Sequence, residues 1–232
     1  MEVNNKTARL AGLLYFLVVI TGIFSLLYVP SKLIVWDNPS ITVENIKASE
    51  GLFRLEILSG LLCYLFFLLL PLVLYQLFKK TNKIVAITMV VLAVASVPIS
   101  FGNMVHKLDI LSLLSGAEYL KAYTPNQIQA QVMLALESYN SGNLIAQTFW
   151  GLWLFPFGYL VFKSGFLPKL LGIFLMVGSI GYFLDFVGRI VCSDFGSLGI
   201  ADYLTIPASI GEIGTCLWLL IMGIKLKKST AE

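Results

Sequence analysis

The stretch GLFRLEILSGLLCYLFFLLL, residues 51–70, carries one arginine and one glutamate at the start of a run that is otherwise almost wholly apolar. A helix needs ~20 apolar residues to cross the ~30 Å hydrocarbon core of a bilayer, and this run is long enough. Arg54 and Glu56 are two residues apart, so on a helix they point to nearly opposite faces. The sequence therefore predicts that Arg54 reaches the membrane interface. Glu56, which faces away from it, is expected to take a partner on another helix.

The whole chain has the composition of a membrane protein. Its 232 residues are 58% hydrophobic and 12% charged, with a mean hydropathy of +0.86. Soluble domains contain about 25% charged residues, so too few ionic groups are present here to cover a water-facing surface. The net charge of +3 is spread over segment ends and gives no reason to expect a nucleic-acid partner. Cys63, Cys192 and Cys216 lie far apart without a CxxC pair, which argues against a disulfide framework or a zinc knuckle.

Six apolar runs predict an all-α bundle of six transmembrane helices in a single domain that covers residues 1–232. The expected spans are residues 8–29, 52–78, 84–105, 142–162, 170–190 and 204–224. The first run is too long for the apolar region of a signal peptide, so we interpret it as a retained helix. Ten lysines and arginines fall on one side of these spans and six on the other. The bias predicts that both termini are cytoplasmic.

An additional helix is expected on the outer side, between the third and fourth spans. Thr124 and Gln127 form a capping box, and Pro125 occupies the first helical position. Apolar side chains then recur at helical spacing, namely Ile128, Val132, Ala135 and Tyr139. The pattern predicts an amphipathic helix that lies along the outer membrane surface or covers the bundle as a lid.

Polar and ionisable residues gather in the outer halves of the predicted spans. Those of the third and fourth spans are Asn103, His106, Asp109, Asn140, Asn143 and Gln147. Asp185 and Arg189 form a favourable pair four residues apart, and Glu212 lies about two turns into the last span. An ionised side chain at mid-bilayer costs roughly 2.5–3.5 kcal/mol on insertion scales, so these groups should face inward and find partners.

Two interpretations of this cluster remain open. In the first, an outward-facing polar cavity binds a ligand. Its residues would be Arg54, Glu56, Gln147, Asp185, Arg189 and Glu212, with the five ionised ones mutually paired. In the second, the ion pairs fix the register of the helices and bind nothing.

Small and aromatic residues suggest how the spans pack. Glycines on the last two spans, Gly178, Gly181, Gly211 and Gly214, favour a close approach near Asp185 and Glu212. Prolines are expected to interrupt the second, third and fourth spans, at Pro71, Pro98 and Pro156. Tryptophans that fall deep in the spans, Trp150, Trp153 and Trp218, would pack helices or line a cavity. An aromatic lining would suit an apolar or lipid-like ligand.

The sequence offers little for catalysis. It has no G-x-S-x-G motif, no P-loop and no dinucleotide fingerprint. His106 is the single histidine, and a metal site would have to combine it with Asp109 and Glu212. A lone interfacial histidine is more often solvated. We therefore expect no metal, no cofactor and no catalytic residue.

Four strings resemble a known family. They are ARLAGLLYFLVVITGIFS, SEGLFRLEILSGLL, FKSGFLPKLLGIFLMVGSIGYFLD and EIGTCLWLLIMGIK. In collinear order they are similar to a bacterial membrane family catalogued as domain of unknown function number four-three-eight-six. The resemblance implies an integral multi-helix protein of the bacterial cytoplasmic membrane and implies no activity. Arg54 and Glu212 lie within the matching strings.

These observations favour a non-enzymatic protein that binds or transports a lipid-like or small polar ligand, with membrane lipids as its partners. Two alternatives stay open, an intramembrane enzyme that modifies lipid and a structural or accessory membrane subunit. The sequence predicts no oligomeric state.

Overall fold

The structure is a computed structural model that describes residues 4–192 and 194–224. Every regular element in this part of the chain is a helix. Their bounds, in chain order, are α1 Asn5–Ile23, η1 Phe24–Tyr28, α2 Val29–Leu33, α3 Pro39–Ala48, α4 Glu50–Phe78, α5 Lys83–Asn103, α6 Val105–Leu113, η2 Glu118–Ala122, α7 Pro125–Leu152, α8 Leu154–Ser164, α9 Lys169–Val191, η3 Phe195–Leu198, α10 Ile200–Leu204, α11 Ile206–Leu217 and η4 Trp218–Met222.

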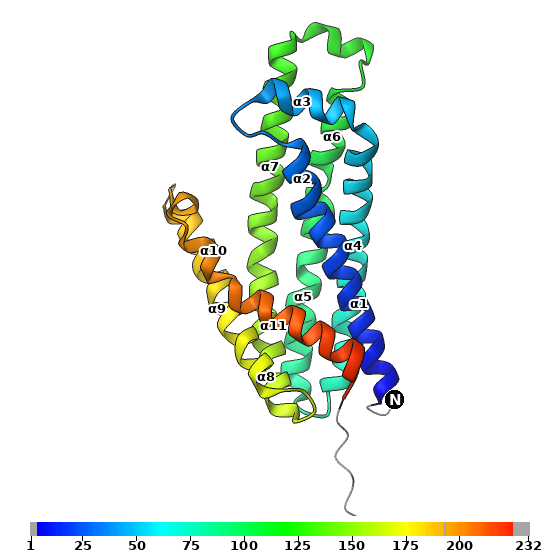
Figure 1. Cartoon of the computed structure of the whole chain (residues 1–232), viewed down its shortest axis with the longest axis vertical. Coiled ribbons are helices and arrows are strands. Elements are labelled where there is room, and N and C mark those ends of the chain that lie inside the picture. The colour runs from blue at the N-terminus through cyan, green and yellow to red at the C-terminus, as the bar shows by residue number, and fades with distance from the viewer. Residues whose placement is uncertain (1–3, 193, 225–232) are drawn as a thin grey trace, which may run out of the picture.

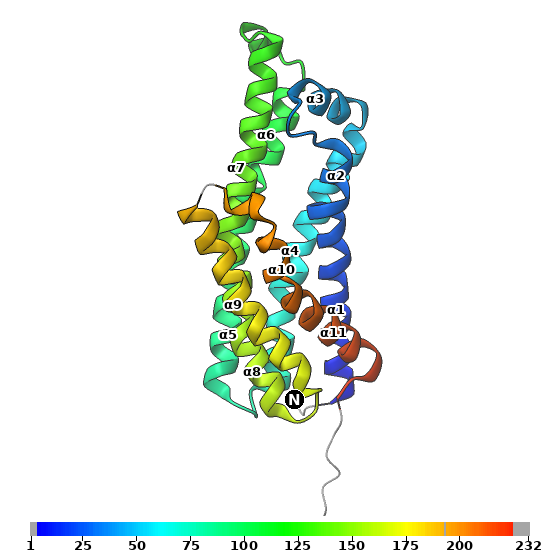
Figure 2. The same ribbon diagram turned by 60° about the vertical axis from the view of Figure 1, so that its left-hand side comes forward.

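Four long rods form the body of the molecule. Figure 1 shows α1 with α2, α4, α5 with α6, and α7 with α8 running along the long axis, while α3 and η2 lie at one end. At the other end α9 packs against α8, and α11 crosses obliquely between α9 and α1. Figure 2 shows the same crossing from the side. One apolar core lies in the half of the molecule that contains α8 and α11, and a second lies under α3, among α2, α4, α6 and α7.

Within the described residues, five helices are long and apolar enough to cross a membrane, as expected of a multi-pass membrane protein. They are Asn5–Leu33, Glu50–Phe78, Lys83–Leu113, Pro125–Ser164 and Lys169–Val191. Each covers one of the first five predicted spans. The sixth predicted span corresponds to Ile206–Met222, which is shorter and lies obliquely rather than along the bundle axis. A helix of this length cannot cross ~30 Å of hydrocarbon unless it stands upright.

The separate outer helix is a wrong prediction. The capping box at Thr124 and Gln127 is present, but the helix it starts continues without a break to Leu152 and enters the membrane-spanning region. Asn140 and Gly142 look like helix breakers in the sequence. In the structure a Cβ at Gly142 would overlap the side chain of Asn103, so glycine serves close packing of α5 on α7 there.

Proline breaks one of the three helices in which it was expected to do so. α4 and α5 continue through Pro71 and Pro98. α7 ends at Leu152, whose carbonyl loses its helical N–H donor because Pro156 has none. The break places Trp153 between α7 and α8, where its side chain is buried.

Glycines set the position of α11. A Cβ at Gly178 of α9 would overlap the backbone of Ala208, and a Cβ at Gly211 would press on Leu175. The predicted contact between the last two spans is therefore present. Gly12 of α1 meets the backbone of η4 in the same way, at Leu220.

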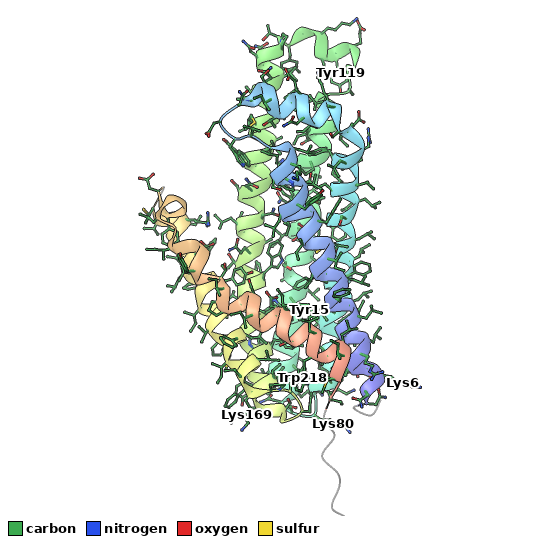
Figure 3. All side chains as sticks on the ribbon, viewed as in Figure 1. Lys6, Tyr15, Lys80, Tyr119, Lys169 and Trp218 are labelled. Atoms are coloured by element: carbon green, nitrogen blue, oxygen red, sulfur yellow. The ribbon has the colours of Figure 1, made fainter. Side chains whose placement is uncertain are left out.

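The two ends of the described chain lie together. The side-chain oxygen of Asn5 accepts a hydrogen bond of 2.9 Å from the backbone N–H of Ile224. Figure 3 places Lys6, Lys80 and Lys169 at this end of the molecule and Tyr119 at the opposite end. These three lysines belong to the side of the spans that carries more basic residues, and they share one end of the described fold.

Replacing Gly178 with alanine tests the close approach of α9 and α11. The added methyl has no room, and overpacking of this kind typically costs about 1–3 kcal/mol. We expect a lower thermal midpoint for the detergent-solubilised protein, measured by circular dichroism. Gly102→Ala is the matched control, because nothing lies within 4 Å of a Cβ there. An equal midpoint for both variants would contradict the packing described.

Candidate functional site

The ionised residues predicted to share one cavity lie in different places. Arg54 pairs with Glu50 one turn earlier on α4, with Nη2 2.7 Å from Oε1. The Arg54 side chain is 60% exposed. It therefore reaches the surface as predicted, and its expected place in a buried cluster is wrong.

Glu56 does take its partner from another helix. Lys107 of α6 donates from Nζ to Glu56 Oε1 at 2.7 Å, and the two side chains are 2% and 3% exposed. The ammonium also lies over the rings of Phe53 and Tyr139, 5.3 and 4.6 Å from their centroids. Sequence reasoning did not identify Lys107 as an inward-facing residue. Its position four residues after Asn103, on the same face, was the signal that it points inward.

Asn103 joins α5 to α7 just below this ion pair. Its side-chain amide donates to the backbone carbonyl of Tyr139 at 2.8 Å and to Asn143 Oδ1 at 3.0 Å. Asn140 is exposed, so Tyr139 takes the inward position that the sequence suggested for its neighbour. The contact locks α7 against α5.

Asp185 forms the third polar centre. It accepts from Arg189 Nε at 2.9 and 3.1 Å, which confirms that predicted pair. The side-chain amide of Gln147, on α7, donates a hydrogen bond of 2.9 Å to Asp185 Oδ2. Asp185 is buried, whereas the Arg189 side chain is 40% exposed and reaches the surface of the bundle.

Glu212 is held by a tyrosine. Tyr15 of α1 donates its hydroxyl proton to Glu212 Oε1 at 2.9 Å. Among the described residues no lysine or arginine forms an ion pair with Glu212, and no hydrogen bond joins it to Asp185. The expectation that Arg54, Asp185 and Glu212 are mutually paired is therefore wrong.

One face of α7 explains this separation. Tyr139, Asn143, Gln147 and Trp150 follow one another at helical spacing, and Trp153 comes directly after the helix. At ~1.5 Å per residue, Tyr139 and Trp153 are ~21 Å apart along the axis. Tyr139 and Asn143 contact Asn103, Gln147 contacts Asp185, and the two tryptophans line the same pocket as Glu212. The inward-facing polar groups thus form a ladder through the bundle, and the sequence prediction of a single shared depth is wrong.

A pocket of about 420 Å³ lies at the lowest level, where α11 crosses α1. Small-molecule sites usually enclose roughly 300–1,000 Å³, so this pocket has a ligand's dimensions. Its aromatic wall is formed by Tyr15, Tyr64, Phe67, Trp150, Trp153 and Tyr182. Glu212 and Ser209 of α11 supply polar atoms on the other side. Figure 3 marks Tyr15 at this crossing.

The pocket is partly open, and its opening is apolar. Ile23, Leu27 and Ile213 line it and are also among the exposed large apolar residues of the surface. The rim of the entrance therefore offers apolar contacts to a molecule that enters the pocket.

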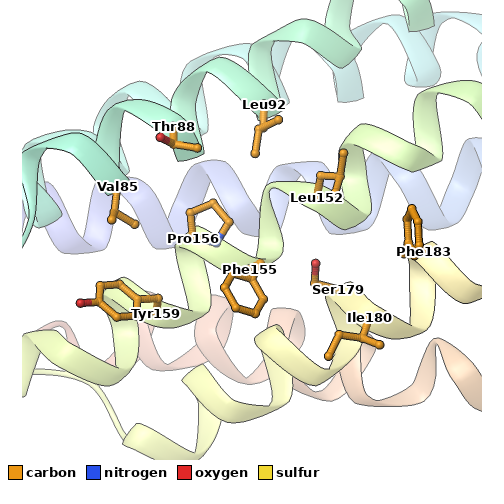
Figure 4. A pocket seen from close by; sticks show the side chains of 10 residues that line it. All are labelled: Val85, Thr88, Leu92, Leu152, Phe155, Pro156, Tyr159, Ser179, Ile180 and Phe183. Carbon is orange, nitrogen blue, oxygen red and sulfur yellow. The ribbon is translucent and has the colours of Figure 1, made fainter.

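A second hollow lies between α5, α8 and α9. Figure 4 shows Leu92 of α5, Phe155 of α8 and Ile180 of α9 around it, and its volume is about 710 Å³. Its lining includes hydroxyl groups on Thr88 and Ser179 and no charged side chain. Such a groove can hold an acyl chain but has no group that would recognise a charged head group.

The metal site considered from the sequence does not form. His106 Nδ1 lies 4.0 Å from Asp109 Oδ2, both side chains are exposed, and Glu212 is bound by Tyr15 instead. In the part of the chain that the structure describes, no three His, Cys, Asp or Glu side chains group together as metal ligands would.

Comparison with known proteins identifies the family. A family model described as domain of unknown function (DUF4386) matches residues 10–223, and the chain belongs to this family. A protein of Archaeoglobus fulgidus described as an uncharacterized protein is 36% identical over 80 residues. That match covers 34% of this chain and 45% of the relative, so less than half of the relative's length is represented. No solved structure matches the chain.

Removing Lys107 tests the buried ion pair. Lys107→Met leaves the Glu56 carboxylate buried without a counter-charge, which typically costs about 3–5 kcal/mol. We expect a loss of this size in the free energy of unfolding in mixed detergent micelles. The double variant Glu56→Gln, Lys107→Met should recover most of it. Arg54→Met breaks only an exposed pair, so a change below about 1 kcal/mol is expected. A similar loss in both single variants would contradict the assignment.

Proposed function

We propose that this member of the DUF4386 family is a multi-pass membrane protein that binds an amphiphilic, lipid-like molecule between its helices. The binding site is the pocket at the crossing of α1 and α11. The observation that carries the proposal is a ligand-sized space with an aromatic wall and one carboxylate.

The shape of the pocket supports an amphiphile rather than a polar solute. Six aromatic side chains surround the space, and the exposed part of its rim is apolar. A ligand with a hydrocarbon body would replace contacts with acyl chains by contacts with protein. Glu212 and Ser209 then stand where a polar end of the ligand can be met.

The rim also supports a route of entry. Ile23 and Leu27 belong to the last turns of α1 and to η1, a π-helical segment in which the backbone is wider than in an α-helix. A ligand dissolved in the bilayer can pass between this segment and α11 without crossing water. This geometry supports binding of a ligand from the membrane. Transport across the membrane would require a second opening of the pocket toward the opposite side.

The remaining polar centres serve the scaffold in this proposal. Glu56 Oε1 is bound by Lys107, with Glu56 Oε2 buried and without a hydrogen-bond partner among the described residues, and Asp185 is bound by Arg189 and Gln147. Glu56 therefore holds α4 against α6 through Lys107, and Asp185 holds α9 against α7 through Gln147, while Arg54 and Arg189 pair within their own helices. Glu212 is the predicted ligand-binding residue that we retain.

The orientation proposed is the one that the basic residues favour. Lys6, Lys80 and Lys169 lie at the end where both described chain ends meet. By the positive-inside rule we assign this end to the cytoplasm and α3 to the outer side. The membrane we propose is the bacterial cytoplasmic membrane.

A side chain placed in the pocket should block binding. A Cβ at Gly22 meets only Cys63 Sγ, at the ordinary contact distance of 3.5 Å, so the backbone accepts a larger residue there. Gly22→Leu would then fill part of the space. We expect at least about a tenfold loss of affinity for 10-bromodecan-1-ol, since displaced apolar contacts of one side chain amount to about 1.4 kcal/mol or more.

The measurement is quenching of tryptophan fluorescence by the bromine atom, because Trp150 and Trp153 line the pocket. Gly102→Leu is the matched control, since its position faces open space. Equal affinity in the wild type and both variants would contradict the proposed site. Absence of any saturable binding to the wild type would favour the structural or accessory role instead.

A further inference from the structure

We infer that the ligand carries a cationic head group, and that Glu212 exchanges a proton for this cation when the ligand binds. The inference rests on the proposed function and specifies its ligand as an alkylammonium-type amphiphile. It follows from a comparison of the acids set among the helices.

Two of these acids are already neutralised inside the protein. Glu56 has the ammonium of Lys107 at 2.7 Å, and Asp185 has the guanidinium of Arg189 at 2.9 Å. Glu212 differs from both, because its hydrogen-bond partner in the described structure is the neutral hydroxyl of Tyr15. Of these three acids, Glu212 alone lacks a counter-charge among the described residues, and it is the one that lines the pocket.

The groups around Glu212 supply no counter-charge. Tyr15 faces it from α1, Tyr182 from α9, and Cys216 follows it on its own helix. From α4, Cys63 and Tyr64 line the same space, and α7 and the α7–α8 break contribute Trp150 and Trp153. All of these side chains are uncharged at neutral pH.

An ionised carboxylate without a counter-charge is costly at membrane depth, at roughly 2.5–3.5 kcal/mol even on insertion scales. In the empty pocket Glu212 therefore carries its proton and is neutral. A positively charged head group changes this balance, because it supplies the missing charge at the carboxylate. The proton then leaves to water, and the pocket keeps zero net charge before and after binding.

The aromatic wall favours the same class of ligand. The faces of tryptophan and tyrosine attract cations, by about 0.5–1 kcal/mol when exposed and about 2 kcal/mol or more when desolvated. Trp150, Trp153 and Tyr64 line the same pocket as Glu212, with Tyr64 stacked on Trp150 and one face of Trp153 stacked on Phe157. Aromatic rings and a carboxylate in one pocket suit an ammonium group, and the remaining apolar lining suits its alkyl chain.

The balanced step is a simple exchange. The protonated Glu212 carboxyl group loses one proton to the aqueous phase, and the ligand cation takes its place as the partner of the carboxylate. No covalent bond to carbon forms or breaks. The hydrogen bond from Tyr15 stabilises the ionised form, since a donor to a charged acceptor is stronger than one to a neutral acceptor.

The test compares two probes of the same chain length, 10-bromodecyltrimethylammonium and neutral 10-bromodecan-1-ol. Tryptophan quenching gives the affinities. Calorimetric titration in two buffers of different ionisation enthalpy gives the number of protons released. For the wild type we expect the cation to bind about tenfold or more tightly than the alcohol, with about one proton released per cation bound.

Two variants separate the carboxyl group from the pocket. Glu212→Gln keeps an acceptor for Tyr15 and removes the exchangeable proton. It should bind both probes with similar affinity and release no proton. Glu137→Gln removes an exposed acid of α7 and should behave as the wild type does. If Glu212→Gln fails to fold, the pH dependence of binding to the wild type still tests the inference. Its affinity for the cation should rise with pH, while its affinity for the alcohol should stay constant.

The outcomes are distinguishable. Equal affinity of the wild type for both probes, or proton release that persists in Glu212→Gln, would overturn the exchange while leaving the binding pocket intact. Absence of saturable binding for either probe would overturn the proposed function as well. A cation preference without proton release would show that Glu212 is ionised in the empty pocket, which also overturns the inference.

Discussion

An ionised side chain among membrane helices must be neutralised within the protein, and this constraint determines where the helices of this chain meet. The ammonium of Lys107 and the carboxylate of Glu56 bring α6 to α4, and Asp185 brings α9 to α7 through Gln147. Each contact joins segments far apart in the sequence. Close packing at glycines then fixes α11, so the position of Glu212 follows from contacts that involve no charge.

The fold class was predictable because composition and run length are strong signals in lipid. Five spans appear where apolar runs of sufficient length occur, and the cap at Thr124 begins a helix as its sequence pattern indicates. The continuity of α7 was not predictable, because Asn140 and Gly142 resemble the end of one helix and the start of another when their neighbours are unknown. Only the packing of Asn103 against Gly142 shows why a glycine is needed inside the helix.

The candidate site was less predictable, for a physical reason. Periodicity shows which residues share a face of one helix, as it did for Asp185 and Arg189, but not which faces of two helices meet or at what height. Glu56 was expected to need a partner on another helix, yet no pattern identified Lys107 as that partner. Glu212 was expected to pair with a cation. Its actual partner, Tyr15, lies 197 positions away in the sequence, and no local pattern connects the two.

The length of the rod formed by α7 and α8 has a consequence for the whole molecule. The run Pro125–Ser164, which consists of α7, Trp153 and α8, comprises 40 residues, which corresponds to ~60 Å of helix, about twice the hydrocarbon thickness of a bilayer. A bilayer that surrounds the α8 end of this run leaves the first turns of α7 beyond its hydrocarbon core, together with α3 and η2. In the orientation that we propose, these elements form a helical platform outside the lipid, within reach of soluble macromolecules.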